Sequence, residues 1–148
     1  MLVAIFCNSY SVANAGDCNG GGVIHEIKML NKSTTDSKMK MVFEPSFVLA
    51  AVGDCITFLP TQKGHNAETI KGMIPKGAKK FKSKMNKELT VKLDVEGLYG
   101  IKCKPHYGMG MIALIQVGEV SEDDIKKAAK VKHRGKAKDR FKGLFDEL

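Results

Sequence analysis

The apolar residues between Val23 and Val117 occur in short runs that are separated by turn-forming residues. The runs are VIHEIKML, FVLAAV, CITFLP, LTVKL, LYGIKC and MIALIQV. Within residues 91–95 and 99–103, apolar positions alternate with polar or glycine positions, which is typical of half-buried strands. Several short strands with turn signals between them predict an all-β sandwich or barrel, in which Cys103 faces inward with its strand neighbours.

The period of two is lost in two places. Residues 70–88 show no regular pattern, and we expect a long connection there with one helical turn. Within residues 119–148, Ser121 precedes three acidic residues, which predicts a capped helix start, and apolar residues at helical spacing follow a break at 134–135. We therefore expect two short helices that pack on a β-domain formed by residues 16–118.

Residues 1–15, MLVAIFCNSYSVANA, join a short apolar run to an A-x-A sequence at positions 13–15. This combination predicts a secretory signal and hence a periplasmic protein. The run is too short to span a bilayer, and no other segment is apolar enough to do so. No Lys or Arg precedes the run, which indicates an atypical signal or a start site placed too far downstream. A disordered or strand-forming N-terminus is the alternative.

Positive charge is concentrated in one part of the chain. The net charge is +8, and residues 63–104 hold eleven Lys against four acidic residues, an excess of seven positive charges. Such a domain can bind nucleic acid, an anionic membrane or an acidic protein. Only Phe81 and Tyr99 lie near these lysines as aromatic residues that could stack on bases, so a nucleic-acid partner is disfavoured.

The most informative segment is CKPHYGMGM at residues 103–111. A strand ends at Cys103, a tight loop carries His106, and Met111 precedes the next strand. A second imidazole is available from His65, which lies in a turn directly after the strand CITFLP. One thiolate, two imidazoles and a weak axial thioether form the ligand set of blue-copper electron-transfer sites. Zinc fits less well, because zinc sites seldom use a thioether.

Each of these residues also has an ordinary explanation. Taken alone, His65 in a turn would usually be a surface residue, and Cys103 at a strand end would usually be a core thiol. Met109 and Met111 could simply fill the core, as methionine often does. A Cys and His pair can form a nucleophile with its base, but no third orienting group is evident. The joint spacing of four donors on two inter-strand loops favours the metal site.

These residues lie within stretches that resemble the cupredoxin family. The stretches are KMLN at 28–31, MVFEP at 41–45, GDCITFLPTQKGHNAETIKGMIPKGA at 53–78 and LYGIKCKPHYGMGMIALIQVG at 98–118. The resemblance implies an eight-stranded Greek-key sandwich that binds one copper ion, shuttles it between Cu(I) and Cu(II), and has no enzymatic activity. It also implies that His65, Cys103, His106 and Met111 are the copper ligands.

The resemblance further implies the surroundings of the site and the partners. Asn31 and Asn66 match positions near the thiolate, and Met41 and Met109 match positions beside the exposed edge of His106. The implied acceptor is copper nitrite reductase or a similar periplasmic protein, with c-type cytochromes as further redox partners, and the carrier is a monomer. The implied process is denitrification.

The exposed edge of His106 is expected to lie in an apolar patch through which an electron passes. We expect lysines around it to steer a partner with an acidic docking surface; these are Lys63, Lys71, Lys76, Lys102 and Lys104. We place the helical tail away from this patch and interpret His25 and His133 as surface residues.

Two cysteines remain once Cys7 is assigned to the signal and Cys103 to the metal. Cys18 and Cys55 can pair, but Cys55 lies in an apolar strand and Cys18 in a Gly-rich stretch. We expect Cys55 to be a buried free thiol, and the pairing stays open.

Competing functions are a copper enzyme, a copper-delivery protein and a basic protein that binds anionic polymers. An enzyme needs a second, open copper site with several imidazoles, and only His25 and His133 are left for it. A delivery protein needs exposed, exchangeable ligands, whereas these donors follow strands of a fixed barrel. Polymer binding rests on charge alone.

Overall fold

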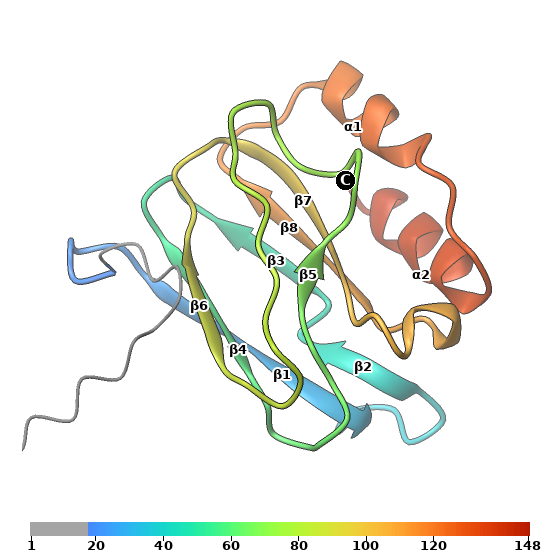
Figure 1. Ribbon diagram of the computed structural model, residues 1–148. Helices are drawn as coiled ribbons and strands as arrows, with labels where there is room; N and C mark the ends of the chain where they lie inside the picture. The colour runs from blue at the N-terminus through green and yellow to red at the C-terminus, as the bar shows by residue number, and fades with distance from the viewer. Residues whose placement is uncertain (1–17) are drawn as a thin grey trace, which may run out of the picture.

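The computed structural model describes residues 18–148, which form two four-stranded sheets packed face to face with two helices outside one of them (Figure 1). The strands are β1 (Ile24–Lys32), β2 (Lys40–Glu44), β3 (Phe47–Ala50), β4 (Cys55–Leu59), β5 (Glu68–Thr69), β6 (Leu89–Lys92), β7 (Gly97–Lys102) and β8 (Ile112–Val117). A 3-10 turn, η1 (Tyr107–Met109), precedes β8, and the helices α1 (Glu122–Ala129) and α2 (Lys136–Phe145) follow it. The expected eight-stranded sandwich with two C-terminal helices is confirmed.

The first sheet has the strand order β2-β1-β4-β6 and the second the order β3-β8-β7-β5. Two neighbouring pairs, β1 with β4 and β3 with β8, run parallel, and the other pairs are antiparallel. Because parallel neighbours need a long crossover, the chain passes from one sheet to the other between them. As a result the loops that leave β4 and β7 meet at one end of the sandwich (Figure 1).

Strand β7 shows why the apolar runs of the second sheet are nearly continuous. Tyr99 and Ile101 face the sandwich interior, as the alternation predicts, but Gly100 is also covered. A Cβ atom at Gly100 would lie 2.7 Å from the side chain of Met73, so the outer face of the strand is closed as well. The helices bury the rest of that face, and Phe141 of α2 lies in one cluster with Leu98 of β7 and with Ile112 and Leu114 of β8.

The start of α1 follows the sequence prediction. The Ser121 hydroxyl accepts a hydrogen bond from the backbone N–H of Asp124 at 3.2 Å, and the acidic residues of the first turn face the positive end of the helix dipole. Within residues 18–148, no helix combines the length and apolar character needed to cross a bilayer.

The connection at residues 70–88 differs from the prediction, because it contains turns and no helical turn. It first runs away from the end where the loops of β4 and β7 meet, since a Cβ atom at Gly97, the first residue of β7, would lie 2.6 Å from Pro75. It then returns, and the backbone of Asn86 donates a hydrogen bond to the carbonyl of His65 at 2.9 Å. Lys76 therefore lies at the opposite end from His65, and its expected place beside His106 is wrong.

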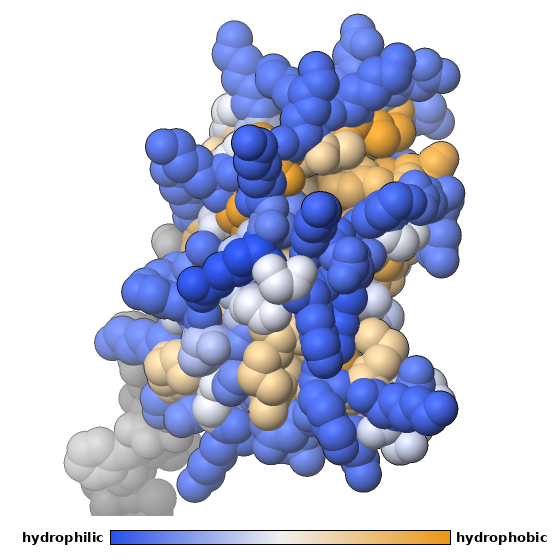
Figure 2. Space-filling view, turned by 90° about the vertical axis from the view of Figure 1, so that its right-hand side faces the viewer, coloured by the Kyte–Doolittle hydropathy of each residue, from blue (hydrophilic) through white to orange (hydrophobic). Residues whose placement is uncertain are grey.

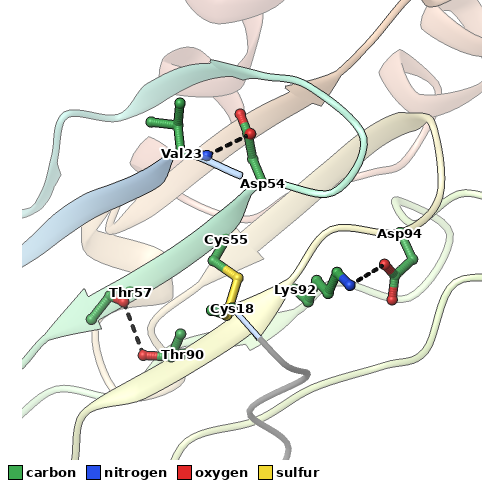
Figure 3. Close-up of a disulfide and its surroundings, with 8 residues drawn as sticks. All are labelled: Cys18, Val23, Asp54, Cys55, Thr57, Thr90, Lys92 and Asp94. Carbon is green, nitrogen blue, oxygen red and sulfur yellow. Dashed lines mark hydrogen bonds and ion pairs between the residues drawn. A yellow bond between two sulfur atoms is a disulfide. The ribbon is translucent and has the colours of Figure 1, made fainter. Parts of the chain in front are cut away.

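The N-terminal part of the described chain is tied to the start of β4 by a disulfide between Cys18 and Cys55 (Figure 3). The expected free thiol at Cys55 is therefore wrong. The close approach of the two strands explains the pairing, since Ile24 pairs with Cys55 in the sheet and a Cβ atom at Gly22 would lie 2.3 Å from the carbonyl oxygen of Gly53. The Gly-rich stretch is thus a tight return that only glycine permits. The signal predicted for residues 1–15 lies outside the described residues.

The turn before β4 is held by a buried carboxylate. Asp54 accepts hydrogen bonds from the backbone N–H groups of Ala51 and Val23, each at 2.9 Å, and lies 2.8 Å from Nε2 of His25. The Ala51 N–H and the His25 ring hold the pKa of the Asp54 carboxyl below its usual value. His25 is therefore part of this network, and its interpretation as a surface residue without a partner is wrong.

Candidate metal centre

Two loops at one end of the sandwich carry the predicted donors. His65 lies in the loop between β4 and β5, while Cys103 directly follows β7 and His106 precedes η1. Because Cys103 continues the inward-facing alternation of β7, its side chain is delivered into the interior at the strand end. The sequence Lys104-Pro105 then turns the chain back toward β8.

The three side chains converge. Sγ of Cys103 lies 3.8 Å from Nδ1 of His65 and 3.7 Å from Nδ1 of His106, and the two Nδ1 atoms are 3.2 Å apart. All three donor atoms lie within 4.8 Å of one another, and among the residues 18–148 this is the one cluster of His, Cys or acidic side chains with the spacing of a metal site. One thiolate and two imidazoles around a single point suit a soft or borderline metal ion.

The predicted fourth donor, Met111, directly precedes β8. Its side chain is fully buried, as are those of His65 and Cys103. The loop brings it back to the other donors through two backbone hydrogen bonds, from Cys103 N–H to the Met111 carbonyl at 3.0 Å and from Met111 N–H to the His106 carbonyl at 3.1 Å. Met109 is 45% exposed and points to the surface, so the two methionines have different environments.

The electrostatics of the cluster reflect its burial. Burial, and then the neighbouring His106, lower the pKa of His65, which favours the neutral imidazole that binds metals. Burial raises the pKa of the Cys103 thiol, and the backbone N–H groups of Asn66 and His106 act against it by bonding to the sulfur. A thiolate at this position therefore needs a cation beside it or depends on these two donors.

Asn31 and Asn66 lie where the family resemblance predicts support for the donors. Oδ1 of Asn31 lies 2.8 Å from Nε2 of His65, so Nε2 carries the proton and donates it to Asn31, which leaves Nδ1 with a lone pair that can bind a metal. Oδ1 of Asn66 accepts a hydrogen bond from Lys104 N–H at 2.8 Å and so joins the two loops. Asn86 adds a support that the sequence did not suggest, because its Oδ1 accepts from Gly64 N–H at 2.6 Å.

His106 is only partly buried, in contrast to the other donors. A Cβ atom at Gly64 would lie 3.8 Å from Cε1 of its ring, an ordinary van der Waals distance, so the turn that carries His65 lies beside this ring. The exposed Met109 and Pro105 lie on the same loop as His106, while Met41 is partly buried with a positive φ of 51°. The end of the molecule thus presents one imidazole among apolar residues.

Lysines at this end are fewer than the sequence suggested. Lys63 and Lys104 are exposed next to the loop residues that carry the donors. Lys102 lies 3.7 Å from a carboxylate oxygen of Glu68 and over the ring of Tyr107, which reduces its field toward solvent. Polar and charged side chains cover most of the face that carries the helices, with smaller apolar areas between them (Figure 2).

The helical tail contacts the loop between His106 and Met111, which corrects its expected place away from the site. The Tyr107 hydroxyl forms a hydrogen bond with Nδ1 of His133, whose ring lies 4.3 Å from that of Phe141. His133 is therefore not a simple surface residue, and burial lowers its pKa. The helical pattern of the tail predicted its apolar face but gave no signal of which surface it covers.

Comparison with known proteins fits this geometry. Residues 29–118 match the family described as "Copper binding proteins, plastocyanin/azurin family". The chain belongs to this family. The pseudoazurin of Paracoccus pantotrophus is 50% identical over 113 residues, which cover 76% of this chain and 76% of the relative. The pseudoazurin of Methylorubrum extorquens is 47% identical over 122 residues, which cover 82% and 80% respectively.

Solved structures give the same assignment. The crystal structure of pseudoazurin from Methylobacterium extorquens AM1 is 46% identical with a TM-score of 0.77, and covers 84% of this chain and 98% of the relative. The pseudoazurin from Hyphomicrobium denitrificans is 38% identical with a TM-score of 0.78, over 85% and 98%. Like other members of this family, the chain is a blue-copper electron carrier that binds one copper ion, and the expected family and cofactor are confirmed.

Proposed function

We propose that His65, Cys103, His106 and Met111 hold the copper ion and that the protein passes single electrons between periplasmic redox partners. The observation that carries this proposal is the convergence of the His65, Cys103 and His106 donor atoms within 4.8 Å of one another, on two loops of a family fold that binds copper. Held by these residues, a copper ion would supply a one-electron couple between Cu(I) and Cu(II), and the role of the four side chains would be to bind and orient it.

The surrounding residues fix the donors so that little has to move. Asn31 keeps Nδ1 of His65 directed at the site, and the N–H groups of Asn66 and His106 support the sulfur of Cys103. Full burial of three donors keeps water out and favours retention of the ion over its delivery to another protein. His106, the partly exposed donor, is the point at which the electron enters and leaves.

The proposed partner has an acidic surface beside its own redox centre, which Lys63 and Lys104 attract. We propose copper nitrite reductase or a c-type cytochrome as this partner, on the family resemblance, and denitrification as the process in which the carrier takes part. The apolar residues around His106 allow a small, short-lived contact from which water is excluded, as is usual for redox pairs. We propose that the carrier acts as a monomer in the periplasm.

The proposed chain organisation is a signal at 1–15, a β-domain at 16–118 and a helical extension at 119–148. It is tested by sequencing the N-terminus of the protein recovered from the periplasmic fraction of cells that express the full chain. A start at residue 16 supports the proposal, and an intact N-terminus in the cytoplasmic fraction contradicts it.

The ligand assignment is tested with Cys103→Ser. The copper-loaded protein should show an intense visible band from thiolate-to-copper charge transfer, and the serine variant should lose it because it has no thiolate. The measurement is the absorption spectrum of each protein at equal copper content. A serine variant that keeps an equal band would show that Cys103 is not a ligand.

A further inference from the structure

The C-terminal extension contacts three of the four residues that separate His106 from Met111. His133 bonds to Tyr107, the backbone at Gly135 packs on Gly108, and Arg140 packs on Gly110. Gly135 and Gly108 approach closely, since a Cβ atom at Gly135 would lie 2.3 Å from the Gly108 carbonyl oxygen. The segment that sets the distance between two proposed ligands is therefore covered by one element from elsewhere in the sequence.

We propose that Arg140 is a positioning residue of the metal centre, which holds the loop before Met111 and the neighbouring backbone of Met41 in one fixed arrangement. The proposal rests on the proposed ligand set, because its effect on copper acts through Met111. Arg140 itself is no ligand, and its guanidinium donates hydrogen bonds to three backbone carbonyl groups.

The guanidinium of Arg140 joins two distant segments. Nη1 donates to the carbonyl of Gly110 at 2.6 Å and to that of Met41 at 2.9 Å, while Nη2 donates to the carbonyl of Lys40 at 2.9 Å. Hydrogen bonds from a charged donor are stronger than neutral ones, and the planar fork fixes their directions. One side chain thus ties the ligand loop to the first strand pair through α2.

Two of the three carbonyl partners, Gly110 and Met41, occur where the backbone is unusual. Gly110 has a φ of 92°, and a Cβ atom there would lie 2.7 Å from Cδ and Nε of Arg140, so the guanidinium lies directly against the loop. Met41 has a φ of 51°, a conformation that non-glycine residues seldom adopt without support from their surroundings. Arg140 supplies that support for the carbonyl of Met41.

The path from Arg140 to the proposed ligands is short. Gly110 precedes Met111 directly, and Ile112 N–H donates to the same Gly110 carbonyl at 3.0 Å. Without the guanidinium, this carbonyl keeps one neutral bond and those of Met41 and Lys40 lose a charged donor. The loop can then turn at Gly110, which changes the distance between the Met111 thioether and the other donors. A weak axial ligand is sensitive to such a change.

The test compares Arg140→Gln with Leu144→Ala. Leu144 lies on the same helix and packs against the apolar cluster that contains Phe141, so its truncation should loosen α2 while the guanidinium stays in place. Three quantities are measured for each variant: the visible spectrum, the rate of copper loss to a chelator, and amide hydrogen exchange at Met111 and Ile112 in the copper-free protein.

Arg140→Gln should raise the rate of copper loss by about 10- to 100-fold, the range for groups that orient metal ligands. It should also change the ratio of the visible bands and speed up exchange at both amides. Leu144→Ala should lower the melting temperature, but its visible bands and its rate of copper loss should stay as in the wild type. If Arg140→Gln does not fold, Arg140→Lys replaces it and should act in the same direction with a smaller effect, since one ammonium group cannot span the carbonyls.

The proposal is overturned if the Arg140 variant keeps the wild-type bands, exchange and copper loss, or if Leu144→Ala changes all three to the same extent. A wild-type protein without the visible band would refute the ligand set. In that case the exchange of the copper-free proteins still decides whether Arg140 fixes the loop.

Discussion

The two ends of strand β4 are built on different principles. At its start, a disulfide and a buried carboxylate join the turn to the N-terminal segment, and no ligand is needed to complete this end. Beyond its last residue, His65 lies beside the other proposed ligands Cys103 and His106 and is held by single hydrogen bonds to Asn31 and Asn86. The C-terminal tail packs on the loop that follows His106. One end therefore provides stability, and the other keeps donors in place for an ion that the chain does not itself supply.

Removing the disulfide should have the largest effect on this contrast. In a protein with Cys18→Ala and Cys55→Ala, the free energy of unfolding should fall by about 4 kcal/mol, because the bond closes a long loop in the unfolded chain. The visible spectrum should stay unchanged, since the site lies at the other end of β4. Denaturant unfolding of the copper-free protein measures the first quantity. An altered spectrum would show that the two ends are coupled.

Replacing the carboxylate at the same end should have the next largest effect. Asp54→Asn weakens charge-assisted bonds to Ala51, Val23 and His25 and should cost about 2 kcal/mol at neutral pH. Since folding lowers the pKa of Asp54, its stabilisation is present above the ordinary value of 3.8 and is lost as the pH falls toward the folded value. The difference between wild type and variant should therefore shrink below pH 4.

Melting temperatures of both proteins between pH 7 and pH 3 test this, with Glu26→Gln as the control. Glu26 is an exposed carboxylate on β1, and its loss should change the melting temperature little. A difference for Asp54→Asn that persists or grows at pH 3 would contradict the assignment.

At the metal end, Met111→Gln should shift the reduction potential by about 60 mV or more, which is tenfold in a one-electron equilibrium. Met109→Gln is the matched control, because it makes the same change on the same loop at an exposed position. Voltammetry and the visible spectrum compare the two. A larger shift from Met109→Gln would exchange their assignments.

The smallest effect concerns encounter with a partner. Lys63→Glu should slow bimolecular electron transfer by about two- to fivefold at low salt, because it removes attraction beside His106. Lys79→Glu is the control, because it makes the same change in net charge at the disulfide end of the molecule. Lys79 lies near Lys92, which pairs with Cys55 in the sheet, and its replacement should slow the transfer less. Stopped-flow rates across a salt series measure both. Equal slowing would show that net charge, not its location, governs the encounter.

The sequence predicts the parts of the structure that depend on local pattern. The strand alternation that turns Cys103 inward, the tight loop that follows it and the capped start of α1 each depend on a few adjacent residues. The convergence of His65 with this loop was also predicted, because both follow strands of one sandwich.

The sequence does not predict contacts between distant segments that have no pattern of their own. The disulfide joins cysteines 37 positions apart. Its one sequence signal was the Gly-rich stretch at 20–22, which is typical of a flexible loop, and only the structure shows that Gly22 packs tightly against Gly53. Arg140 donates hydrogen bonds to backbone carbonyls 99 and 100 residues away. Every residue has such a carbonyl, so no residue type in the sequence signals these partners. The same reason explains why the tail was expected on another face.

The contact of Arg140 with Gly110 has a consequence for the order of events during synthesis. A nascent chain that has emerged as far as β8 already carries all four proposed donors, but the residue that holds their loop is translated 30 positions after Gly110. Copper that reaches such a chain meets donors whose spacing is not yet set. If Arg140 has its proposed role, the centre is complete only when the last helix docks, and we expect metal loading to be most selective after the whole polypeptide has folded.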